Sequence, residues 1–427
     1  MSTQQTTQQT RGQAPSPTST LTLVAFIVFI DMVGIGLIVP VLPDLLEEVT
    51  GKGLAESAQI GGWLLFAYAL MQFLFAPVIG GLSDRFGRRP VLLITLFALG
   101  IDYAIMAWAP TLFWLFLGRI IAGIMGASWA AANSCIADLA TPEERGKFFG
   151  IMGGAGASGF VIGPAIGGVL GEMGVRLPFV ASAVLALVGA VIGYFYLRET
   201  LPPERRRAFT LARANPLGTL IQMGRNPIVL GFIVVIFFMQ LAGQAQMSVW
   251  SYHTQLVFDW SLEEIGYSVA LFGLIVAFVQ GGLTGKVIAK TGPRKTALLG
   301  FLLASPAFFL FAFAQSSWFM IVGIIFGSFG GLTFPALQQM MSERVAEDAQ
   351  GELQGAIASA MSITSIIGPV IMTSVFSTFA DDEGVYFPGA PYLLAAMLSL
   401  TGIAIAIWNI MRMPQEATGQ AAETAPG

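Results

Sequence analysis

The sequence has 427 residues, of which 55% are hydrophobic and 11% are charged, and its formal net charge is −4. Soluble domains average about 25% charged residues, so this composition excludes an ordinary soluble protein and indicates that most of the chain faces lipid or other apolar helices. A single cysteine and a single histidine exclude a disulfide framework and a metal cluster built on these residue types.

The chain opens with a segment rich in Ser, Thr and Gln, residues 1–20, which is typical of a disordered tail. The first apolar run, residues 21–43, is too long for the core of a signal peptide and has no small-residue cleavage pattern after it, so it is predicted to be a membrane helix. Eleven further runs are long enough to cross a bilayer as a helix of about 20 residues, and the short alternating segments of a membrane β-barrel are not found. The twelve predicted spans are 21–43, 60–82, 91–109, 111–138, 147–171, 177–197, 227–252, 265–285, 296–314, 316–340, 353–379 and 388–411.

The basic residues set the expected orientation of these spans. With the N-terminus placed inside, 18 of the 21 Lys and Arg residues fall on the cytoplasmic side, Lys52 and Arg176 fall outside, and Arg119 lies within a span. Short cytoplasmic loops are enriched in Lys and Arg, so both termini are predicted to be cytoplasmic. The outside loops carry acids instead, among them Asp44 and Glu47.

The longest loop, residues 198–226, divides the spans into six and six. It contains the arginine cluster 205–207, which is interpreted as a solvated cluster that fixes the topology near anionic headgroups, with a specific lipid or regulatory site as the alternative. The expected organisation is a tail (1–20), an N-terminal six-helix bundle (21–197), a cytoplasmic linker (198–226), a C-terminal six-helix bundle (227–412) and a cytoplasmic tail (413–427).

An internal repeat relates the two halves. At one fixed shift along the chain Gly87 falls on Gly292, and the pair Gly163–Pro164 falls on Gly368–Pro369. Halves that share landmarks in one register are expected to be the same unit in the same orientation. The predicted fold class is therefore an all-α membrane protein with 12 transmembrane helices in two parallel six-helix repeats, with a substrate site at the midplane between them.

Three ionisable residues lie inside predicted spans, where charges are costly and functional by default. Asp31 lies roughly 15 Å into its helix, Asp102 lies at a similar depth, and Arg119 lies about 12 Å into the next helix from the other side, so all three are expected near mid-bilayer. Two acids and one arginine leave one carboxylate without a matching charge, which suits a group that takes up and releases a proton. Proton coupling is the functional interpretation, and a structural Asp–Arg pair that holds helices together is the alternative.

Three glycine-containing motifs lie at intervals along the first half. Residues 80–93 read GGLSDRFGRRPVLL, residues 119–127 read RIIAGIMGA, and residues 159–168 read GFVIGPAIGG. Together with the topology and the repeat, these motifs resemble the major facilitator superfamily, and segments such as DMVGIGLIVPVLPDLL and FPALQQMMS resemble its tetracycline efflux group. The residues that match the cytoplasmic gate motif are Gly80, Asp84, Arg85, Gly87, Arg88 and Arg89, and those that match the antiporter motif of helix 5 are Gly159, Gly163, Pro164, Gly167 and Gly168.

The resemblance implies a drug:proton antiporter of the bacterial inner membrane that works by alternating access, is not an enzyme and uses the proton gradient without a cofactor. Its implied partners are a small amphipathic drug, protons and membrane lipid, with no nucleic acid, and we expect a monomer. The resemblance also implies that Asp84 and the arginines of the gate motif latch the two halves together on the cytoplasmic side, with a topology anchor as the alternative. The pair Gly163–Pro164 is interpreted as a point where helix 5 bends, with close packing of small residues as the alternative. A facilitator or proton symporter for a small polar solute is the alternative function, which the helix 5 motif disfavours.

Uncharged polar and aromatic residues within the spans predict the lining of a central cavity. Tetracycline exporters typically carry a histidine in helix 8 and an acid in helix 9, but those positions here hold Val276 and Ala304, which leaves the identity of the substrate open. His253, at the outer end of helix 7, is interpreted as a surface or helix-end residue rather than a proton relay. The predicted cavity residues are Gln72, Gln240, Gln244, Gln246, Trp250, Gln280, Phe334 and Gln338.

Overall fold

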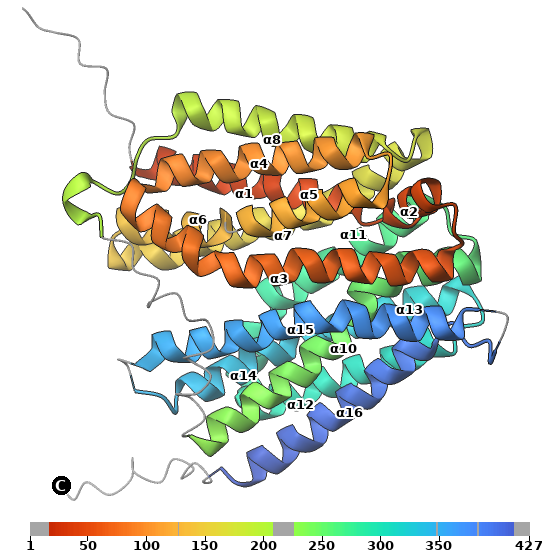
Figure 1. The fold of residues 1–427 in the computed structure, drawn as a ribbon. Helices are drawn as coiled ribbons and strands as arrows, with labels where there is room; N and C mark the ends of the chain where they lie inside the picture. The colour runs from red at the N-terminus through yellow and green to blue at the C-terminus, as the bar shows by residue number, and fades with distance from the viewer. Residues whose placement is uncertain (1–16, 127, 208–225, 347–348, 382–383, 414–427) are drawn as a thin grey trace, which may run out of the picture.

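The computed structural model describes residues 17–126, 128–207, 226–346, 349–381 and 384–413. Within these ranges every regular element is a helix, and the helices form two bundles (Figure 1). The first helix begins at Pro17, inside the tail predicted for residues 1–20. The rest of that tail, the tail after residue 413 and residues 208–225 of the predicted linker lie outside the described residues.

The two halves of the chain contribute the two bundles. The first bundle contains α1 (Pro17–Ile38), α2 (Leu42–Thr50), α3 (Leu54–Phe86), α4 (Arg88–Trp108), α5 (Leu112–Met125), α6 (Ser128–Leu139), α7 (Pro142–Met173) and α8 (Leu177–Tyr196). The second contains α10 (Pro227–Phe258), α11 (Leu262–Phe278), the π-helical segment η3 (Val279–Leu283), α12 (Thr284–Ala312), α13 (Ser317–Ser328), the 3-10 segment η4 (Phe329–Leu332), α14 (Thr333–Ser342), α15 (Gln350–Phe379) and α16 (Ala390–Met411). A single 3-10 turn, η1 (Pro203–Arg205), lies between the halves.

The helices account for the twelve predicted spans. Ten helical stretches of the described chain are long and apolar enough to cross a membrane, and α5 is a shorter apolar helix. One stretch, Leu262–Ala312, holds two crossings, because the backbone turns at Gly292 with φ 78° and ψ 160°. Helix α5 followed by α6 completes a further crossing, so the predicted number of spans and the all-helical fold class are confirmed.

Several predicted span limits are wrong, because helices break at residues that are themselves apolar or small. The span 21–43 ends early: α1 stops at Ile38, and α2 starts a new helix after the turn that contains Pro40, whose nitrogen carries no hydrogen to continue the helix. The span 111–138 is divided between α5 and α6, and the span 316–340 is interrupted by η4.

Local sequence signals explain where the longer helices begin. The Ser261 side chain accepts a hydrogen bond from the Glu264 backbone N–H at 3.2 Å, while the Glu264 side chain accepts one from the Ser261 N–H at 2.9 Å, so α11 starts with a capping box. The Asn226 side chain accepts from the N–H groups of Ile228 and Val229 and starts α10 in the same way.

The two bundles meet along two pairs of helices, α3 with α15 and α7 with α11. Figure 1 shows α3 of the first bundle lying beside α15 of the second. Glycines make these approaches close: a Cβ on Gly62 of α3 would stand 3.1 Å from the Pro369 carbonyl oxygen of α15, and a Cβ on Gly168 of α7 would stand 2.9 Å from the Glu263 Cα of α11.

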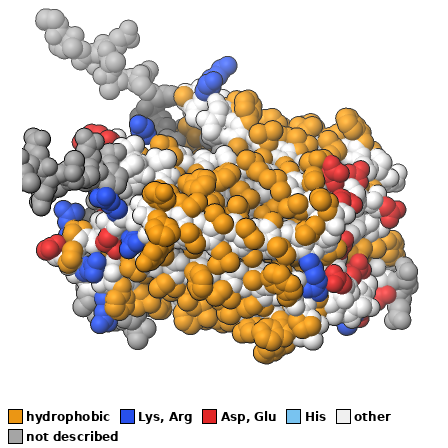
Figure 2. Space-filling model, turned by 90° about the horizontal axis from the view of Figure 1, so that it is seen from above, with side chains coloured by type: hydrophobic (Ala, Val, Ile, Leu, Met, Phe, Trp, Pro, Cys, Tyr) orange, Lys and Arg blue, Asp and Glu red, His pale blue; other side chains and the backbone are white. Residues whose placement is uncertain are grey.

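The surface has an apolar band between two charged ends. In Figure 2 hydrophobic side chains cover the middle of the face, Lys and Arg gather at one end, and Asp and Glu gather at the other. We call the end with Arg85, Arg88 and Arg89 the basic end, and the end with Asp44 and Glu47 the acidic end. Large apolar side chains such as Phe195 are exposed in the band, which is the pattern of a surface in contact with lipid.

The buried cores differ between the two ends. At the acidic end one core takes side chains from both bundles, for example Leu46 and Leu64 from the first and Tyr252 and Phe376 from the second. At the basic end each bundle has its own core, centred on α1, α4 and α6 in the first and on α10, α14 and α15 in the second. The halves are therefore joined at the acidic end and separately packed at the basic end.

Candidate functional site

A buried ion pair lies in the first bundle. Asp102 on α4 is fully buried, Arg119 on α5 is almost so, and Arg119 donates a hydrogen bond to the Asp102 carboxylate. The pair is possible because Gly118 has no side chain: a Cβ there would stand 2.5 Å from Asp102 Oδ1. The Asp–Arg pairing proposed from the sequence is thus present. About one helix turn before and after Asp102, α4 carries the buried apolar residues Leu99 and Met106.

Aromatic and amide groups of α3 connect this pair to the interior of the molecule. The Arg119 guanidinium carbon lies 5.8 Å from the centre of the Tyr68 ring. The Gln72 side-chain amide donates to the Tyr68 hydroxyl at 3.3 Å and to the Gly126 carbonyl oxygen of α5's C-cap at 2.9 Å. Gly123 lets α5 approach α3 this closely, since a Cβ there would stand 2.7 Å from Met71 Cβ.

Asp31 is buried on α1, with 6% of its surface exposed. Tyr68 and Tyr103 both lie within electrostatic range of Asp31, Asp102 and Arg119, so the three charges predicted to sit at mid-span share one neighbourhood. Tyr103 packs against α1 one turn after Asp31, where a Cβ on Gly34 would stand 3.1 Å from the Tyr103 ring.

A central cavity of 270 Å³ lies between the bundles. Ile35 of α1 and Tyr68 of α3 line it from the first bundle, and Gln244 of α10 and Phe272 of α11 line it from the second. A smaller cavity of 120 Å³ continues toward the acidic end and has Arg119 in its wall. The buried ion pair therefore borders the central space through its arginine.

A second chamber of 230 Å³ lies within the second bundle and adjoins the first at Gln246 and Phe272. Gln240, Gln280 and Phe334 line this chamber. Val276 and Ala304 line it too.

The structure separates the predicted cavity residues into two kinds. Gln72, Gln244 and Trp250 line the central cavity, but Gln72 also bonds a neighbouring helix, and Trp250 is 3% exposed, with its ring nitrogen donating to Ser268 Oγ at 2.9 Å. Gln338 lines neither cavity, and its amide instead donates to Gln354 of α15 at 3.0 Å. Its position on α14 faces α15 in this arrangement, and a substrate-binding role for Gln338 stays a prediction.

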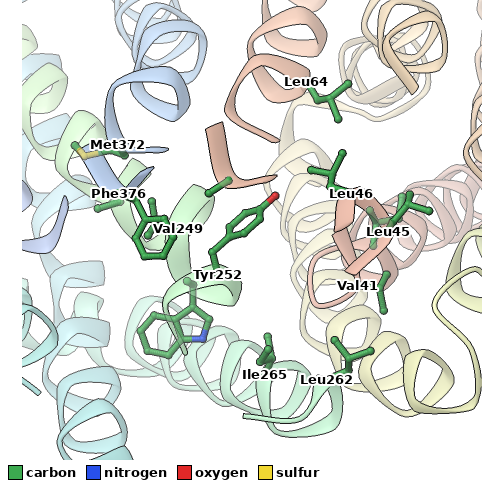
Figure 3. Close-up of a cluster of buried hydrophobic side chains, with 14 of the residues drawn as sticks. Val41, Leu45, Leu46, Leu64, Val249, Tyr252, Leu262, Ile265, Met372 and Phe376 are labelled. Atoms are coloured by element: carbon green, nitrogen blue, oxygen red, sulfur yellow. The ribbon is translucent and has the colours of Figure 1, made fainter. Parts of the chain in front are cut away.

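At the acidic end the bundles are sealed by the shared core. Figure 3 shows Tyr252 projecting between Leu46 and Val249, with Phe376 beside it. Polar contacts cross the same boundary: the Gln255 amide donates to Asp44 Oδ1 at 2.5 Å. These contacts close the central cavity at the acidic end of the molecule.

The seal includes a carboxyl whose ionisation opposes closure. Burial raises the pKa of the Asp44 carboxyl above its usual 3.8, the Gln255 hydrogen bond opposes this, and the charge of Glu172 adds to it. Burial also raises the pKa of Glu47, and the charge of Asp44 adds to that rise.

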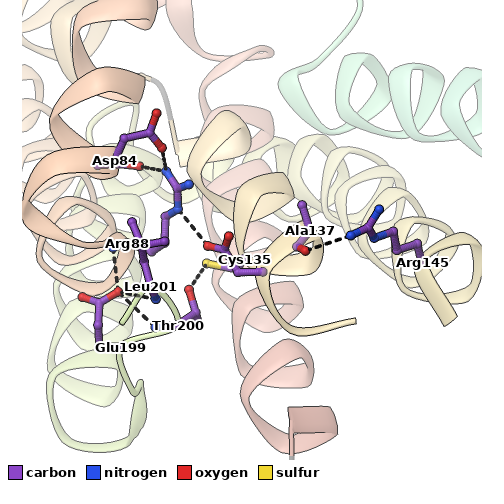
Figure 4. Close-up of polar contacts among 10 residues, drawn as sticks. Asp84, Arg88, Cys135, Ala137, Arg145, Glu199, Thr200 and Leu201 are labelled. Atoms are coloured by element: carbon purple, nitrogen blue, oxygen red, sulfur yellow. Dashed lines mark hydrogen bonds and ion pairs between the residues drawn. The ribbon is translucent and has the colours of Figure 1, made fainter. Parts of the chain in front are cut away.

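At the basic end the gate motif forms a network inside the first bundle (Figure 4). Arg88 pairs with Asp84 at 2.6 Å and donates from Nε to Asp138 of α6 at 3.0 Å. The Glu199 carboxylate accepts hydrogen bonds from three backbone N–H groups, those of Arg88, Thr200 and Leu201. Gly87 makes the turn with φ 107°, and a Cβ there would stand 2.6 Å from Glu199 Cδ.

The other gate-motif residues lie nearby. Arg89 donates to the Tyr194 carbonyl oxygen of α8 at 2.6 Å, and the Arg85 guanidinium carbon lies 5.1 Å from the Phe86 ring. A Cβ on Gly80 would have nothing within 4 Å, so no helix packs closely there in this arrangement. The side-chain partners found for Asp84 belong to its own bundle.

The helix 5 motif is a strip of close backbone contacts. A Cβ on Gly159 would stand 2.6 Å from the Phe29 carbonyl oxygen, and one on Gly163 would stand 2.7 Å from that of Val33, both on α1. Gly167 meets the Leu37 backbone of α1, whereas Gly168 and the Pro164 carbonyl face α11 of the other bundle. The helix α7 that carries them runs from Pro142 to Met173 with Pro164 inside it, and a bend at Gly163–Pro164 stays a prediction beside these close contacts.

His253 is not the surface residue expected. It is 2% exposed, and its ring lies 5.0 Å from that of Tyr392, with Phe258 and Phe376 also in contact. The expectation of a surface position is wrong because the aromatic cluster is assembled from helices far apart in the sequence, whereas His253 does lie near the end of α10, which stops at Phe258.

Sequence reasoning missed several residues of these sites. Asp138 and Gln255 bond residues of these sites from other helices, Glu199 does so from the segment after α8, and Tyr68 links the ion pair to the cavity. An Asp or Glu at a span end is an ordinary topological feature, so only the three-dimensional arrangement singles these residues out. Among the described residues no group of His, Cys, Asp and Glu could hold a metal ion.

Two six-helix bundles around a central cavity, inside an apolar band and beside a buried ion pair, define a membrane transporter. The family model of the Major Facilitator Superfamily matches residues 24–369 and again residues 281–426. The chain belongs to this superfamily, which confirms the family resemblance inferred from the motifs.

Related proteins agree with this assignment. The class C tetracycline resistance protein of Escherichia coli is 41% identical over 87% of this chain and 92% of its own length. The class E tetracycline resistance protein of Escherichia coli is 39% identical over 84% of this chain and 88% of its own length. Among solved structures, a bacterial homologue of the human lysosomal transporter Spinster, in an inward-facing and occupied conformation, superposes with a TM-score of 0.76 at 19% identity, over 94% of this chain and 98% of that one.

Proposed function

We propose that this chain is a proton-coupled efflux antiporter that exports small amphipathic drugs by alternating access. The observation that carries the proposal is the buried Asp102–Arg119 pair, whose arginine borders a cavity between two bundles that are closed at one end. The relatives named as tetracycline resistance proteins support drug efflux as the process.

The orientation follows from the distribution of charge. Short cytoplasmic segments are enriched in Lys and Arg, so the basic end faces the cytoplasm and both termini lie there. In this proposal the acidic end, with Asp44 and Glu47, faces outward, and the packing of that end corresponds to an inward-facing arrangement with its outer end sealed. In the domain organisation that we propose, residues 21–197 and 227–412 rock as two bundles joined by the cytoplasmic linker 198–226, and the chain acts as a monomer.

The buried charges act as the proton site. A carboxylate at mid-membrane is stable when it is paired or protonated, because an unpaired charge there is costly. Protonation of Asp102 or Asp31 removes a negative charge and frees Arg119 from part of its attraction, and Arg119 transmits that change to the cavity wall and to Tyr68. Drug and proton thereby exclude each other across one space, which is the condition for antiport.

The gate motif acts at the basic end of the molecule, in the step of the transport cycle in which the outer end opens. When the outer end opens, the basic end must close, and we propose that the network of Asp84, Arg88 and Asp138 then approaches the start of α15. We propose that Asp84 then exchanges Arg88 for a contact with that helix N-terminus, where a carboxylate is favoured. In this proposal the latch is open in the inward-facing arrangement, and the absence of close neighbours around a Cβ on Gly80 supports this.

The driving force is adequate for export. One elementary charge crossing about 100 mV releases about 2.3 kcal/mol. Since about 1.4 kcal/mol corresponds to a factor of ten, one proton sustains a drug gradient of roughly fifty-fold. We therefore propose that the proton gradient drives export and that no cofactor is used.

The test is proton movement in proteoliposomes. Asp31→Asn is expected to abolish drug-induced proton flux while the protein remains folded in the membrane. The matched control is Asp259→Asn, an exposed residue at φ 52°, a conformation that asparagine tolerates. Drug-induced proton flux at the wild-type rate in Asp31→Asn would overturn the role of Asp31. Accumulation that persists after an uncoupler collapses the gradient would instead indicate a facilitator.

A further inference from the structure

The chamber in the second bundle is built by the C-terminal half alone. Its wall comes from α10, α11, η3, α12, α13, η4, α14 and α16, and no residue of the first bundle lines it. It adjoins the central cavity at Gln246 and Phe272, so a molecule entering the central cavity has direct access. Ligand pockets in proteins are typically about 300–1,000 Å³, and the two adjoining chambers together fall in this range.

Irregular backbone faces this chamber from two sides. The π-helical segment η3 holds Gln280, and the 3-10 segment η4 holds Gly330 and Gly331, and these two segments contact each other. At membrane depth such backbone is tolerated only where it is buried in protein or lines a cavity, and it recurs at the substrate sites of transporters. π-Helical turns are rare and are frequent at functional sites. Two such segments facing one space point to a binding site.

The lining of the chamber has a definite chemistry. Its described lining residues include no Asp, Glu, Lys, Arg or His. In the part of the chain that the structure describes, the side-chain amides of Gln240, Gln246 and Gln280 have no protein hydrogen-bond partner and remain available for a ligand. Phenylalanine rings supply most of the remaining surface, and they are Phe272, Phe301, Phe308, Phe311 and Phe334.

Charge is concentrated in the opposite bundle. The Asp102–Arg119 pair and Asp31 all lie in the first half, whereas the chamber wall carries apolar side chains at positions such as Val276 and Ala304. A cationic drug or a drug–metal chelate would enter the chamber without a counter-charge, and an unpaired charge away from water is costly. An uncharged aromatic compound would avoid the free-energy cost of an unpaired charge and would gain ring contacts and amide hydrogen bonds.

We propose that the chamber is the substrate site and that it takes uncharged aromatic compounds carrying amide or hydroxyl groups, without a metal ion, while the first bundle handles only protons. The inference rests on the proposed antiport function. It has a consequence for charge balance: exchange of an uncharged molecule for a proton moves net positive charge inward in every cycle. Export is therefore electrogenic, and a membrane potential alone drives it.

The experiment uses purified protein in proteoliposomes with three probes. Chloramphenicol represents an uncharged aromatic amide with hydroxyl groups, ethidium represents a permanent cation, and tetracycline with and without Mg²⁺ represents a chelate. Proton flux and transport are measured with a pH gradient alone and with a valinomycin-imposed potassium potential alone. The expected result is chloramphenicol transport under either force, independent of Mg²⁺. After the rate in empty liposomes is subtracted for each probe, chloramphenicol should be transported at least tenfold faster than ethidium.

Variants locate the site. Gln280→Leu and Phe334→Ala are expected to weaken chloramphenicol binding at least tenfold while leaving the folded protein intact. The matched controls are Gln338→Leu, whose amide bonds Gln354 outside the chamber, and Phe278→Ala, whose ring is 69% exposed on α11. Ala304→Asp is expected to lower chloramphenicol transport and to raise ethidium transport, because it supplies the missing counter-charge.

The outcomes separate this inference from the proposed function. If no probe moves protons, the antiport function itself fails. If ethidium or the Mg²⁺ chelate moves protons as well as chloramphenicol does, or if the chamber variants behave like their controls, antiport stands and the assignment of the chamber is overturned. Chloramphenicol transport that responds to the pH gradient but not to the potential would also overturn it.

Discussion

Replacing Gly163 of α7 by alanine is expected to force α1 and α7 apart. The new Cβ would stand 2.7 Å from the Val33 carbonyl oxygen and 2.8 Å from the Gly36 Cα. Both neighbours are backbone atoms, so no change of rotamer can relieve the contact, and a helix must move. Overpacking of a well-packed interior costs about 1–3 kcal/mol. About 2–4 °C is lost per kcal/mol in chains of about 150–250 residues and less in longer ones, so the melting temperature should fall by a few degrees and by no more than roughly 12 °C.

The measurement is thermal unfolding of the detergent-solubilised protein, together with initial transport rates. The matched control is Gly154→Ala on the same helix, where a Cβ would have nothing within 4 Å. Gly154→Ala is expected to match the wild type or to be slightly more stable, since alanine is the better helix former by about 0.5–1 kcal/mol. Equal melting temperatures for the Gly163 and Gly154 variants would refute the view that the helix 5 motif is a strip of obligatory backbone contacts.

Three further predictions concern the charged groups. Asp102→Asn leaves Arg119 buried without a counter-charge and should destabilise the protein by about 3–5 kcal/mol, whereas adding Arg119→Gln should recover most of the loss in thermal unfolding; a double variant no more stable than the single one would contradict the coupling. The pKa of Asp44 is raised chiefly by burial, so the contribution of this carboxyl to closure of the acidic end is fully present below the usual value of 3.8 and is lost as the pH rises through the raised value; Asp44→Asn, which keeps a partner for Gln255, should reduce the pH dependence of spin-label distances across that end, and an unchanged pH dependence would exclude this carboxyl. Asp84→Asn should slow transport several-fold with drug affinity retained, measured by initial rates and equilibrium binding, and wild-type rates would count against the latch.

The number and order of the helices were predictable because bilayer crossing demands long apolar segments, and length and hydropathy are properties of the chain alone. Helix breaks were not, because the residues at them are as apolar or small as their neighbours. The turn after Ile38 and the π-helical segment at Gly281 and Gly282 are invisible to a hydropathy window. Only packing against other helices decides whether a glycine there bends, bulges or continues the helix.

The site was predictable as a set of residue types and not as an arrangement. The cost of a charge in lipid singled out Asp102 and Arg119, which the structure pairs. Which glutamines face the cavity depends on the rotation of each helix about its axis, so Gln280 lies in the chamber while Gln338 bonds α15. Partners such as Glu199 lie in loops that are far away in the sequence from the residues they bond, so no local sequence pattern indicates them.

The two bundles share one core at the acidic end and have separate cores at the basic end, and this difference favours one conformation of the empty transporter. Parting the bundles at the acidic end would bring water to side chains such as Leu46, Leu64 and Phe376, whereas parting them at the basic end leaves each bundle's own core dry. At roughly 25 cal/mol for every Å² of apolar surface wetted, an outward excursion is uphill unless new contacts form on the cytoplasmic face. If the orientation proposed above holds, an empty carrier is expected to rest with the acidic end closed, so that its cavity opens toward the cytoplasm.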